Sequence, residues 1–310
     1  MTWILLATAG QFLLAIVAII DKYIVCAKDG LPRPFVYAFY SCLVTGGWVL
    51  VYFLSFIPGL AELGAPAFAN VQQPTIQVVG MSFLAGYTFF MALVSLYDAL
   101  KHADASDVMP VIGAVSAMAT FGLSYFFLDA QLTQNYIWGI ALLATGTLLV
   151  SEVRFTRRIA LTTVHSGLFF ALHFITMKGL FLETSFDDGF FWSRVGFVMF
   201  ALSLLLVPSY WSKITEQTQE TSVRTGWLVL AAKIMAGIAA FMLLKATDWG
   251  EVEVVQALDG LKFVFILLIG LLIGRSIPRC AGENERDSNT VIRKTAYVAI
   301  ICIGYVILFI

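Results

Sequence analysis

The amino-acid sequence predicts an all-α integral membrane protein whose ten transmembrane helices form two inverted repeats of five helices. Composition gives the class: the 310-residue chain is 60% hydrophobic and 13% charged, with a mean hydropathy of +0.87. A soluble domain carries about 25% charged residues. The apolar residues fall in ten runs without the alternating pattern of a membrane barrel, so a helix bundle is the spanning structure that fits. A duplicated segment, described below, indicates the two repeats.

Each of the ten apolar runs is bounded by charged or helix-breaking residues. The first run lacks a basic leader and a cleavage site, so we expect a retained transmembrane helix. Three connecting segments are long and are expected to be surface loops: Pro58–Gln77, Pro208–Thr225 and Arg275–Lys294. The runs are Trp3–Ile20, Phe35–Ile57, Val78–Leu96, Val108–Leu128, Tyr136–Val150, Ile159–Met177, Phe190–Val207, Gly226–Leu244, Val252–Gly274 and Thr295–Ile310.

Two segments that lie 144 residues apart share the pattern Lys-x-x-Asp-x-small-acid-Val, namely Lys101–Val108 and Lys245–Val252. A weaker match pairs Lys22 with Lys178, each near the end of an apolar run, where snorkelling to the interface is the default expectation. Duplication predicts two domains, residues 1–155 and 156–310. Because five is odd, the second repeat inserts in the opposite sense to the first. Chance similarity of short loop segments is the alternative.

The basic residues predict an orientation in the membrane. The loops after the odd-numbered runs hold 14 Lys and Arg residues, whereas the opposite loops hold only Lys178 and Lys245. Cytoplasmic loops are enriched in Lys and Arg, so this count places both termini outside. We expect a multi-pass protein of the inner or plasma membrane.

Several function classes lack support in the sequence. A net charge of −1 gives no electrostatic case for nucleic-acid binding. The four cysteines and three histidines show no metal-ligand spacing, and no nucleotide-binding glycine motif is present. Neither His165 nor His173 has a serine partner in a recognised catalytic motif. We therefore expect no metal, no cofactor and no enzymatic activity.

The ninth run carries the most informative polar residues. Gln256, Asp259 and Lys262 are spaced three apart, which places them on one face of a helix. A charge at membrane depth costs roughly 2.5–3.5 kcal/mol on insertion scales. The stripe is therefore expected to face a polar interior and to bind substrate, with Asp259 as a protonatable coupling group. The alternative is that Asp259 and Lys262 neutralise each other and only fix helix packing.

Other polar residues inside the runs extend the candidate site. Lys233 lies mid-run, whereas Arg194 lies near the start of its run, where snorkelling is an equal alternative. Three cations against the single anion Asp259 would make the cavity net positive and favour an anionic group on the substrate. The remaining candidate substrate-binding residues are His173, Tyr40 and Tyr87.

A resemblance to a known family rests on several short motifs. They include Tyr97-x-Ala99-Leu100-Lys101, Met109-Pro110, and the turn Phe127–Thr133 followed by a helix with Gly139 and Gly146. This arrangement resembles the EamA repeat of the drug/metabolite transporter superfamily, over essentially the whole chain. Leu128-Asp129 and Gly274-Arg275 stand where that family usually has a Gly-Glu turn.

The resemblance implies a ten-helix basket around a central cavity, with helices 5 and 10 peripheral. It also implies cytoplasmic termini, against the basic-residue count, which we follow. The expected function is secondary transport, in the export direction, of a small metabolite such as an amino acid or a related anionic or zwitterionic compound. The alternatives are a translocator of lipid-linked or nucleotide-linked sugar and a non-transporting scaffold. The expected partners are the lipid bilayer and a small-molecule substrate, with a monomer as the simplest oligomeric state.

Overall fold

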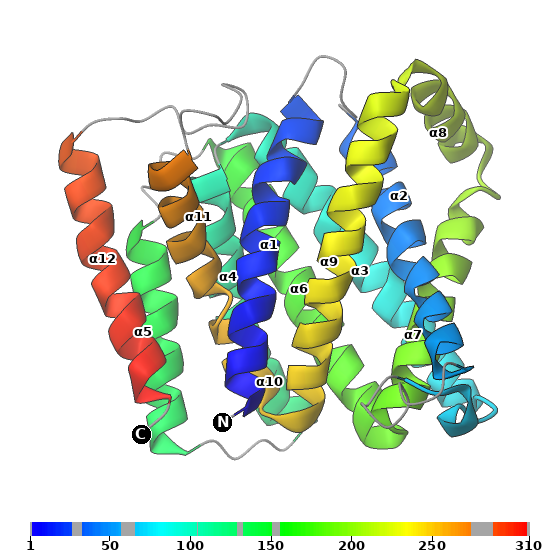
Figure 1. The fold of residues 1–310 in the computed structure, drawn as a ribbon, viewed down its shortest axis with the longest axis horizontal. Coiled ribbons are helices and arrows are strands. Elements are labelled where there is room, and N and C mark those ends of the chain that lie inside the picture. Colours follow the sequence, from blue (N-terminus) through cyan, green and yellow to red (C-terminus); the bar gives the residue numbers. More distant parts are fainter. Residues whose placement is uncertain are drawn as a thin grey trace.

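The computed structural model describes residues 2–26, 33–56, 66–103, 105–128, 133–150, 156–273 and 288–308, and every regular element in these ranges is helical (Figure 1). The elements are α1 (Thr2–Cys26), α2 (Pro34–Gly46), the 3₁₀ helices η1 (Gly47–Phe56) and η2 (Phe68–Asn70), α3 (Ile76–His102), α4 (Ala105–Phe127), α5 (Gln134–Val150), α6 (Arg157–Glu183), α7 (Phe186–Leu204), α8 (Pro208–Glu220), α9 (Val223–Trp249), α10 (Val252–Ala257), α11 (Gly260–Ile273) and α12 (Ser288–Ile307).

Length and apolar composition identify the helices that can cross a membrane. Among the described residues, six helices qualify as spans, and a seventh is added if α7 and α8, bent by 99° relative to each other, count as one. A shorter apolar helix covers Tyr297–Ile307. The prediction of an all-α, multi-pass membrane protein is therefore confirmed at the level of class. Wide apolar surface is exposed, as at Phe126 and Leu272, which suits contact with lipid.

Several predicted boundaries are wrong, and two of them change the interpretation of the chain. Helix α1 does not end at Ile20 but continues to Cys26, so Asp21 is buried inside it. The segment Pro208–Thr225 is not a loop, because α8 forms there; Pro208 occupies the first helical turn, where its missing N–H costs nothing. Low hydropathy hides this helix from a search for apolar runs.

The ninth run is also not one helix. It divides into α10 and α11 at Leu258 and Asp259, where hydrogen bonds from residue i to i−3 replace the α-helical pattern. A stretch of 3₁₀ bonding between helical segments often marks a functional hinge or a strained sequence. At Gly260, an added Cβ would overlap the hydroxyl of Thr147 on α5, so glycine permits the close approach there.

Contacts fix the direction of four central helices. Helices α1 and α9 are antiparallel, because Asp21 near the end of α1 meets Lys233 in the first half of α9, while Trp3 lies against Gly250. Helices α3 and α6 are also antiparallel, since Ser95 meets His165 and Ala85 meets His173. Both chain termini lie at the lower end in Figure 1.

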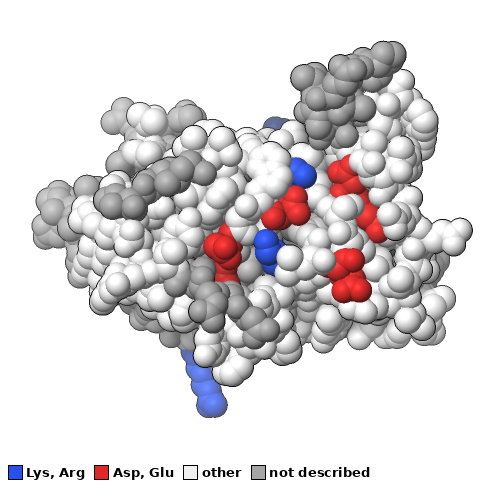
Figure 2. Space-filling model, turned by 90° about the horizontal axis from the view of Figure 1, so that it is seen from below, with Lys and Arg blue, Asp and Glu red and all other residues white. Residues whose placement is uncertain are grey.

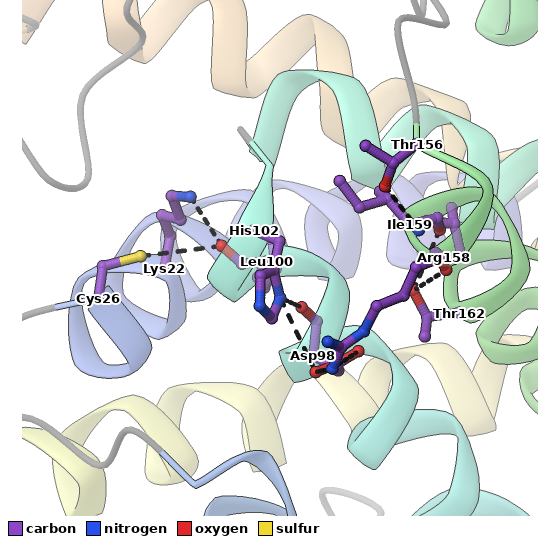
Figure 3. A network of polar contacts seen from close by, with 10 residues as sticks. Lys22, Cys26, Asp98, Leu100, His102, Thr156, Arg158, Ile159 and Thr162 are labelled. Atoms are coloured by element: carbon purple, nitrogen blue, oxygen red, sulfur yellow. Dashed lines mark hydrogen bonds and ion pairs between the residues drawn. The ribbon is translucent and has the colours of Figure 1, made fainter.

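Two lysines bind the carboxyl ends of neighbouring helices. Lys22 of α1 donates to the carbonyls of Leu100 and Ala103 at the end of α3, at 2.7 and 2.6 Å. Figure 3 shows Lys22 and Cys26 directed at Leu100, beside the ion pair of Arg158 with Asp98. The prediction that Lys22 snorkels to the interface is wrong. The side chain is only 6% exposed and binds carbonyls that have no partner within their own helix.

Lys178 plays the corresponding part in the second half of the chain. Its ammonium donates to the carbonyls of Thr247 and Gly250 at the end of α9, at 2.8 and 3.0 Å. This contact lies at the lower end of the molecule, which Figure 2 shows with acidic side chains (red) around its middle and basic ones (blue) between them. The helix ends bring four exposed or half-buried acids to this end of the molecule: Glu183, Asp187, Asp248 and Glu251.

Candidate functional site

A cavity of about 140 Å³ lies among the central helices. Helices α1 to α4 and α6, α7, α9, α10 and α11 contribute lining residues, whereas the described parts of α5 and α12 contribute none. Much of the wall is apolar, with Phe89, Phe170, Phe174 and Phe197 among its aromatic residues. The polar lining residues are Gln11, Asp21, Ser41, Thr45, Tyr97, Ser116, His173, Arg194, Lys233, Gln256, Asp259 and Lys262.

An ion pair between Asp21 of α1 and Lys233 of α9 forms one part of the wall. The Lys233 ammonium lies 2.8 Å from Asp21 Oδ1 and 3.0 Å from Oδ2, and these side chains are only 6% and 3% exposed. A buried pair of this kind is tolerated when further hydrogen bonds satisfy both partners. The pair connects two helices that lie 212 residues apart in the sequence.

Two tyrosines complete that network. The hydroxyl of Tyr97 accepts a hydrogen bond from Lys233 at 2.8 Å and lies 3.1 Å from the hydroxyl of Ser41. Tyr37 donates to Asp21 and packs its ring against that of Tyr97, with centroids 4.2 Å apart. Lys233 also lies over the Tyr37 ring, 4.5 Å from its centroid. Every polar group in this network is therefore engaged by another.

The predicted stripe of the ninth run does reach the cavity, although its helix is broken. Lys262 pairs with Asp259 at 2.6 Å, while Gln256 accepts a hydrogen bond from Ser116 of α4 at 2.8 Å. The Asp259 carboxylate lies against Gly113, where an added Cβ would come within 2.7 Å of Oδ2. Asp259 and Lys262 neutralise each other here, so the structural alternative for this pair stays open.

Arg194 occupies a different environment from the two lysines. It is the ninth residue of α7, because that helix begins four residues before the predicted run, and it is only 2% exposed. Its guanidinium carbon lies 4.7 Å and 4.4 Å from the ring centroids of Phe190 and Phe197. Nε donates to Ser193 at 3.3 Å, but Nη2 is buried without a hydrogen-bond partner among the described residues. Arg194 therefore does not snorkel to the interface.

His173 and Gln11 provide further polar atoms at the wall. His173 places Nδ1 3.1 Å from the Ala85 carbonyl, so the neutral ring donates from Nδ1 and leaves Nε2 as an acceptor. The ring packs against Phe89 and Phe197. Gln11 has a buried Oε1 that meets no donor among the described residues. The wall therefore offers unused acceptors as well as the unused donor of Arg194.

The predicted charge count needs correction. Asp21 is a second acid at membrane depth, which the prediction of a single anion missed because the residue follows the last apolar residue of its run. Three cationic and two acidic side chains line the cavity, which leaves one positive charge in excess. Asp21 neutralises Lys233 and Asp259 neutralises Lys262, so the excess lies at Arg194.

Six of the eight predicted substrate-binding residues line the cavity: Arg194, Lys233, Gln256, Asp259, Lys262 and His173. Tyr40 and Tyr87 lie elsewhere. Tyr40 bonds to Thr218 of α8, and Tyr87 is 39% exposed and packs on Phe169. A single sequence fixes the rotational phase of a helix only coarsely, so it could not determine whether these two rings face the cavity. Substrate binding by all eight residues stays a prediction.

One serine–histidine pair forms outside the cavity. Ser95 Oγ lies 2.7 Å from His165 Nδ1, joining α3 to α6. The His165 ring packs on Phe169, and no ion pair joins it to a carboxylate of the described residues. The pair lacks the third group that orients a catalytic base. We interpret it as a hydrogen bond between helices.

Comparisons with known proteins inform the fold only. No protein-family model matches the sequence, and no curated protein matches it. Chains of solved structures do match, 28 in all. One, described only as "Crystal structure of protein", superposes with a TM-score of 0.64 at 18% sequence identity, covering 99% of this chain and 96% of the other. The fold therefore has a solved counterpart along almost its full length.

Proposed function

We propose that the protein is a secondary transporter of the drug/metabolite transporter type, which moves a small metabolite across its membrane by alternating access. The observation that carries the proposal is a cavity among the apolar helices whose largely apolar wall includes several charged side chains. Ionisable residues inside a membrane are costly and commonly mark a substrate or ion pathway. Five charged side chains of the described residues line this cavity: Asp21, Arg194, Lys233, Asp259 and Lys262. The proposed substrate is an amino acid or a related anionic or zwitterionic compound, with export as the proposed direction.

The arrangement of helices supports two inverted repeats of five. If α1, α2, α3 and α5 of the first repeat correspond to α6, α7, α9 and α12 of the second, the contact of α1 with α9 corresponds to that of α6 with α3. The contacts of α2 with α7 and of α5 with α12 each join two corresponding helices. The helix-end contacts of Lys22 and Lys178 correspond in the same way. In such transporters, the two repeats move against each other around a site at their interface. Here the Asp21–Lys233 pair bridges the proposed repeats, so that motion must break or shift it.

The cavity volume favours a small substrate over the sugar-linked alternatives. An apolar cavity of about 150 Å³ takes up a molecule the size of benzene. The cavity here is about 140 Å³. A nucleotide-linked or lipid-linked sugar is several times larger than benzene, so a translocator of such compounds would need a much wider site.

Counterflow in proteoliposomes tests the proposal. Vesicles loaded with an unlabelled amino acid should take up the same labelled compound, and each amino acid would be tried in turn. We expect Asp259→Asn to keep counterflow but to lose accumulation driven by a proton gradient, because an amide, unlike a carboxylate, does not bind and release a proton near neutral pH. Asp98→Asn is the matched control, since Asp98 lies outside the cavity and pairs with Arg158.

The outcomes separate coupling from transport. Unchanged proton-driven accumulation in Asp259→Asn would remove the coupling role of Asp259 while leaving transport intact. Binding of an amino acid without counterflow by folded wild-type protein would instead favour the non-transporting scaffold.

A further inference from the structure

Arg194 is a buried cation that no acid of the described residues neutralises. Among the described residues, no carboxylate forms an ion pair with it, and one guanidinium nitrogen has no acceptor at all. A buried charge in a protein is normally paired, because removal from water without compensation is unfavourable. The aromatic rings of Phe190 and Phe197 compensate in part through cation–π contacts. They leave Nη2 of the guanidinium without a hydrogen-bond acceptor among the described residues.

Arg194 also lines the cavity, so an anionic ligand in the cavity could pair with its guanidinium. The two other cations of the wall are each engaged by an acid, at 2.8 Å and 2.6 Å. The excess of one positive charge in the cavity therefore belongs to Arg194. A guanidinium presents its donors in a planar fork that matches the two oxygens of a carboxylate.

We propose that Arg194 is the anion anchor of the cavity and that it binds the carboxylate of a small monoanionic or zwitterionic ligand with an apolar body. The proposal deepens the proposed function, on which it rests for the ligand being a transported substrate. A single negative charge balances the single excess cation, whereas a phosphate monoester carries roughly −1.5 to −2 at neutral pH.

The rest of the wall fits the remainder of such a ligand. Phe89, Phe197 and Phe174 offer aromatic surface for an apolar body. The buried Oε1 of Gln11, which meets no donor among the described residues, can accept a hydrogen bond from an ammonium or amide on the ligand. The cavity of about 140 Å³ limits that body to about the size of a benzene ring.

Benzoate and benzamide make a matched pair of probes for this site. They share shape and ring, but only benzoate is charged at neutral pH. We expect benzoate to raise the melting temperature of the wild-type protein in detergent with a saturable dependence on concentration, and benzamide to have little effect. Arg194→Gln should weaken benzoate binding at least about 30-fold, since a buried charge pair loses one partner. Arg194→Lys should retain part of the affinity.

Arg158→Gln is the control variant. Arg158 is 68% exposed at its side chain and lies outside the cavity, so benzoate should bind this variant as it binds the wild type. If Arg194→Gln does not fold, the comparison of benzoate with benzamide on wild-type protein still tests the anchor. Equal binding of the two probes would overturn the proposal, as would unchanged benzoate binding in folded Arg194→Gln.

Inorganic anions test whether the site prefers a carboxylate over other anions. Sodium chloride and sodium phosphate are tested against sodium gluconate, which is too large for the cavity. An Arg194-dependent shift with chloride or phosphate equal to that with benzoate would overturn the assignment to a carboxylate ligand.

Benzoate binding in detergent tests the anchor, and counterflow in vesicles tests the transport function, so either proposal can be rejected while the other is kept. Counterflow that survives Arg194→Gln would reject the anchor and keep the transporter. Arg194-dependent benzoate binding in a protein that transports no amino acid would keep the anchor and reject the transporter.

Discussion

Lys233 and Arg194 are buried cations on the wall of the same cavity, but their surroundings differ. Lys233 is bonded to the Asp21 carboxylate and to Tyr97 at 2.8 Å each. Arg194 lies between two phenylalanine rings and has no acidic partner among the described residues. Both side chains are at most 3% exposed, so burial does not distinguish them.

The difference separates a cation that joins two helices from the cation that we propose to bind a ligand. The bond between Lys233 and Asp21 lies between α1 and α9, so its energy contributes to the association of those helices. Among the described residues, no acid pairs with Arg194, so the loss of its hydration is compensated only in part, by Phe190 and Phe197. Substitution of Lys233 should therefore mainly lower the stability of the protein, whereas substitution of Arg194 should mainly weaken ligand binding.

The largest effect is expected from Lys233→Met. Removing one partner leaves the Asp21 carboxylate buried and unpaired, which typically costs about 3–5 kcal/mol. The double variant Asp21→Asn, Lys233→Met should recover much of that loss, because neither buried charge remains. The measurement is the melting temperature of purified protein in detergent, supported by the yield of monodisperse protein. A double variant no more stable than Lys233→Met would show that the pair does not act as a unit.

A smaller effect is expected at the two lysines that bind helix ends. Lys22→Met and Lys178→Met each leave carbonyls without their donors, at a cost of about 1–3 kcal/mol. If the halves are equivalent, the two variants should lower the melting temperature by similar amounts. Arg157→Met serves as a control, since Arg157 is exposed at the start of α6 and its substitution should leave the melting temperature nearly unchanged. Loss at Lys22 with none at Lys178 would argue against the correspondence of the halves.

Much of the fold follows from local sequence, and its exceptions have local reasons. Long apolar runs are sufficient to predict spanning helices, because every backbone group must be satisfied within the membrane. Helix α8 was missed because its polar composition resembles a loop. The division between α10 and α11 was missed because no proline marks it; there Gly260 approaches Thr147, a contact between residues far apart in the chain.

Site residues could be predicted where a polar side chain interrupts an apolar run of the sequence. Lys233 and Gln256 stand out as polar residues inside apolar runs, and both line the cavity. Asp21 was missed because it directly follows an apolar run, where a charge normally marks the end of a span. Its partner lies 212 residues away, so no local pattern announces the pair. The charge excess at Arg194 emerges only when each acid has been assigned to its cation.

The smallest effect on stability is expected from Arg194→Met, and it sharpens the comparison most. The substitution removes a buried charge that no acid of the described residues neutralises, and it also removes contacts with Phe190 and Phe197. Cation–π contacts contribute about 0.5–2 kcal/mol, which the relieved desolvation of the guanidinium should largely offset. The ligand-free melting temperature should therefore lie close to that of the wild type, within about 1 kcal/mol of stability, while that of Lys233→Met falls well below it. Equal losses in the two variants would mean that Arg194 holds the helices together as Lys233 does, and the assignment of its charge to a ligand would fail.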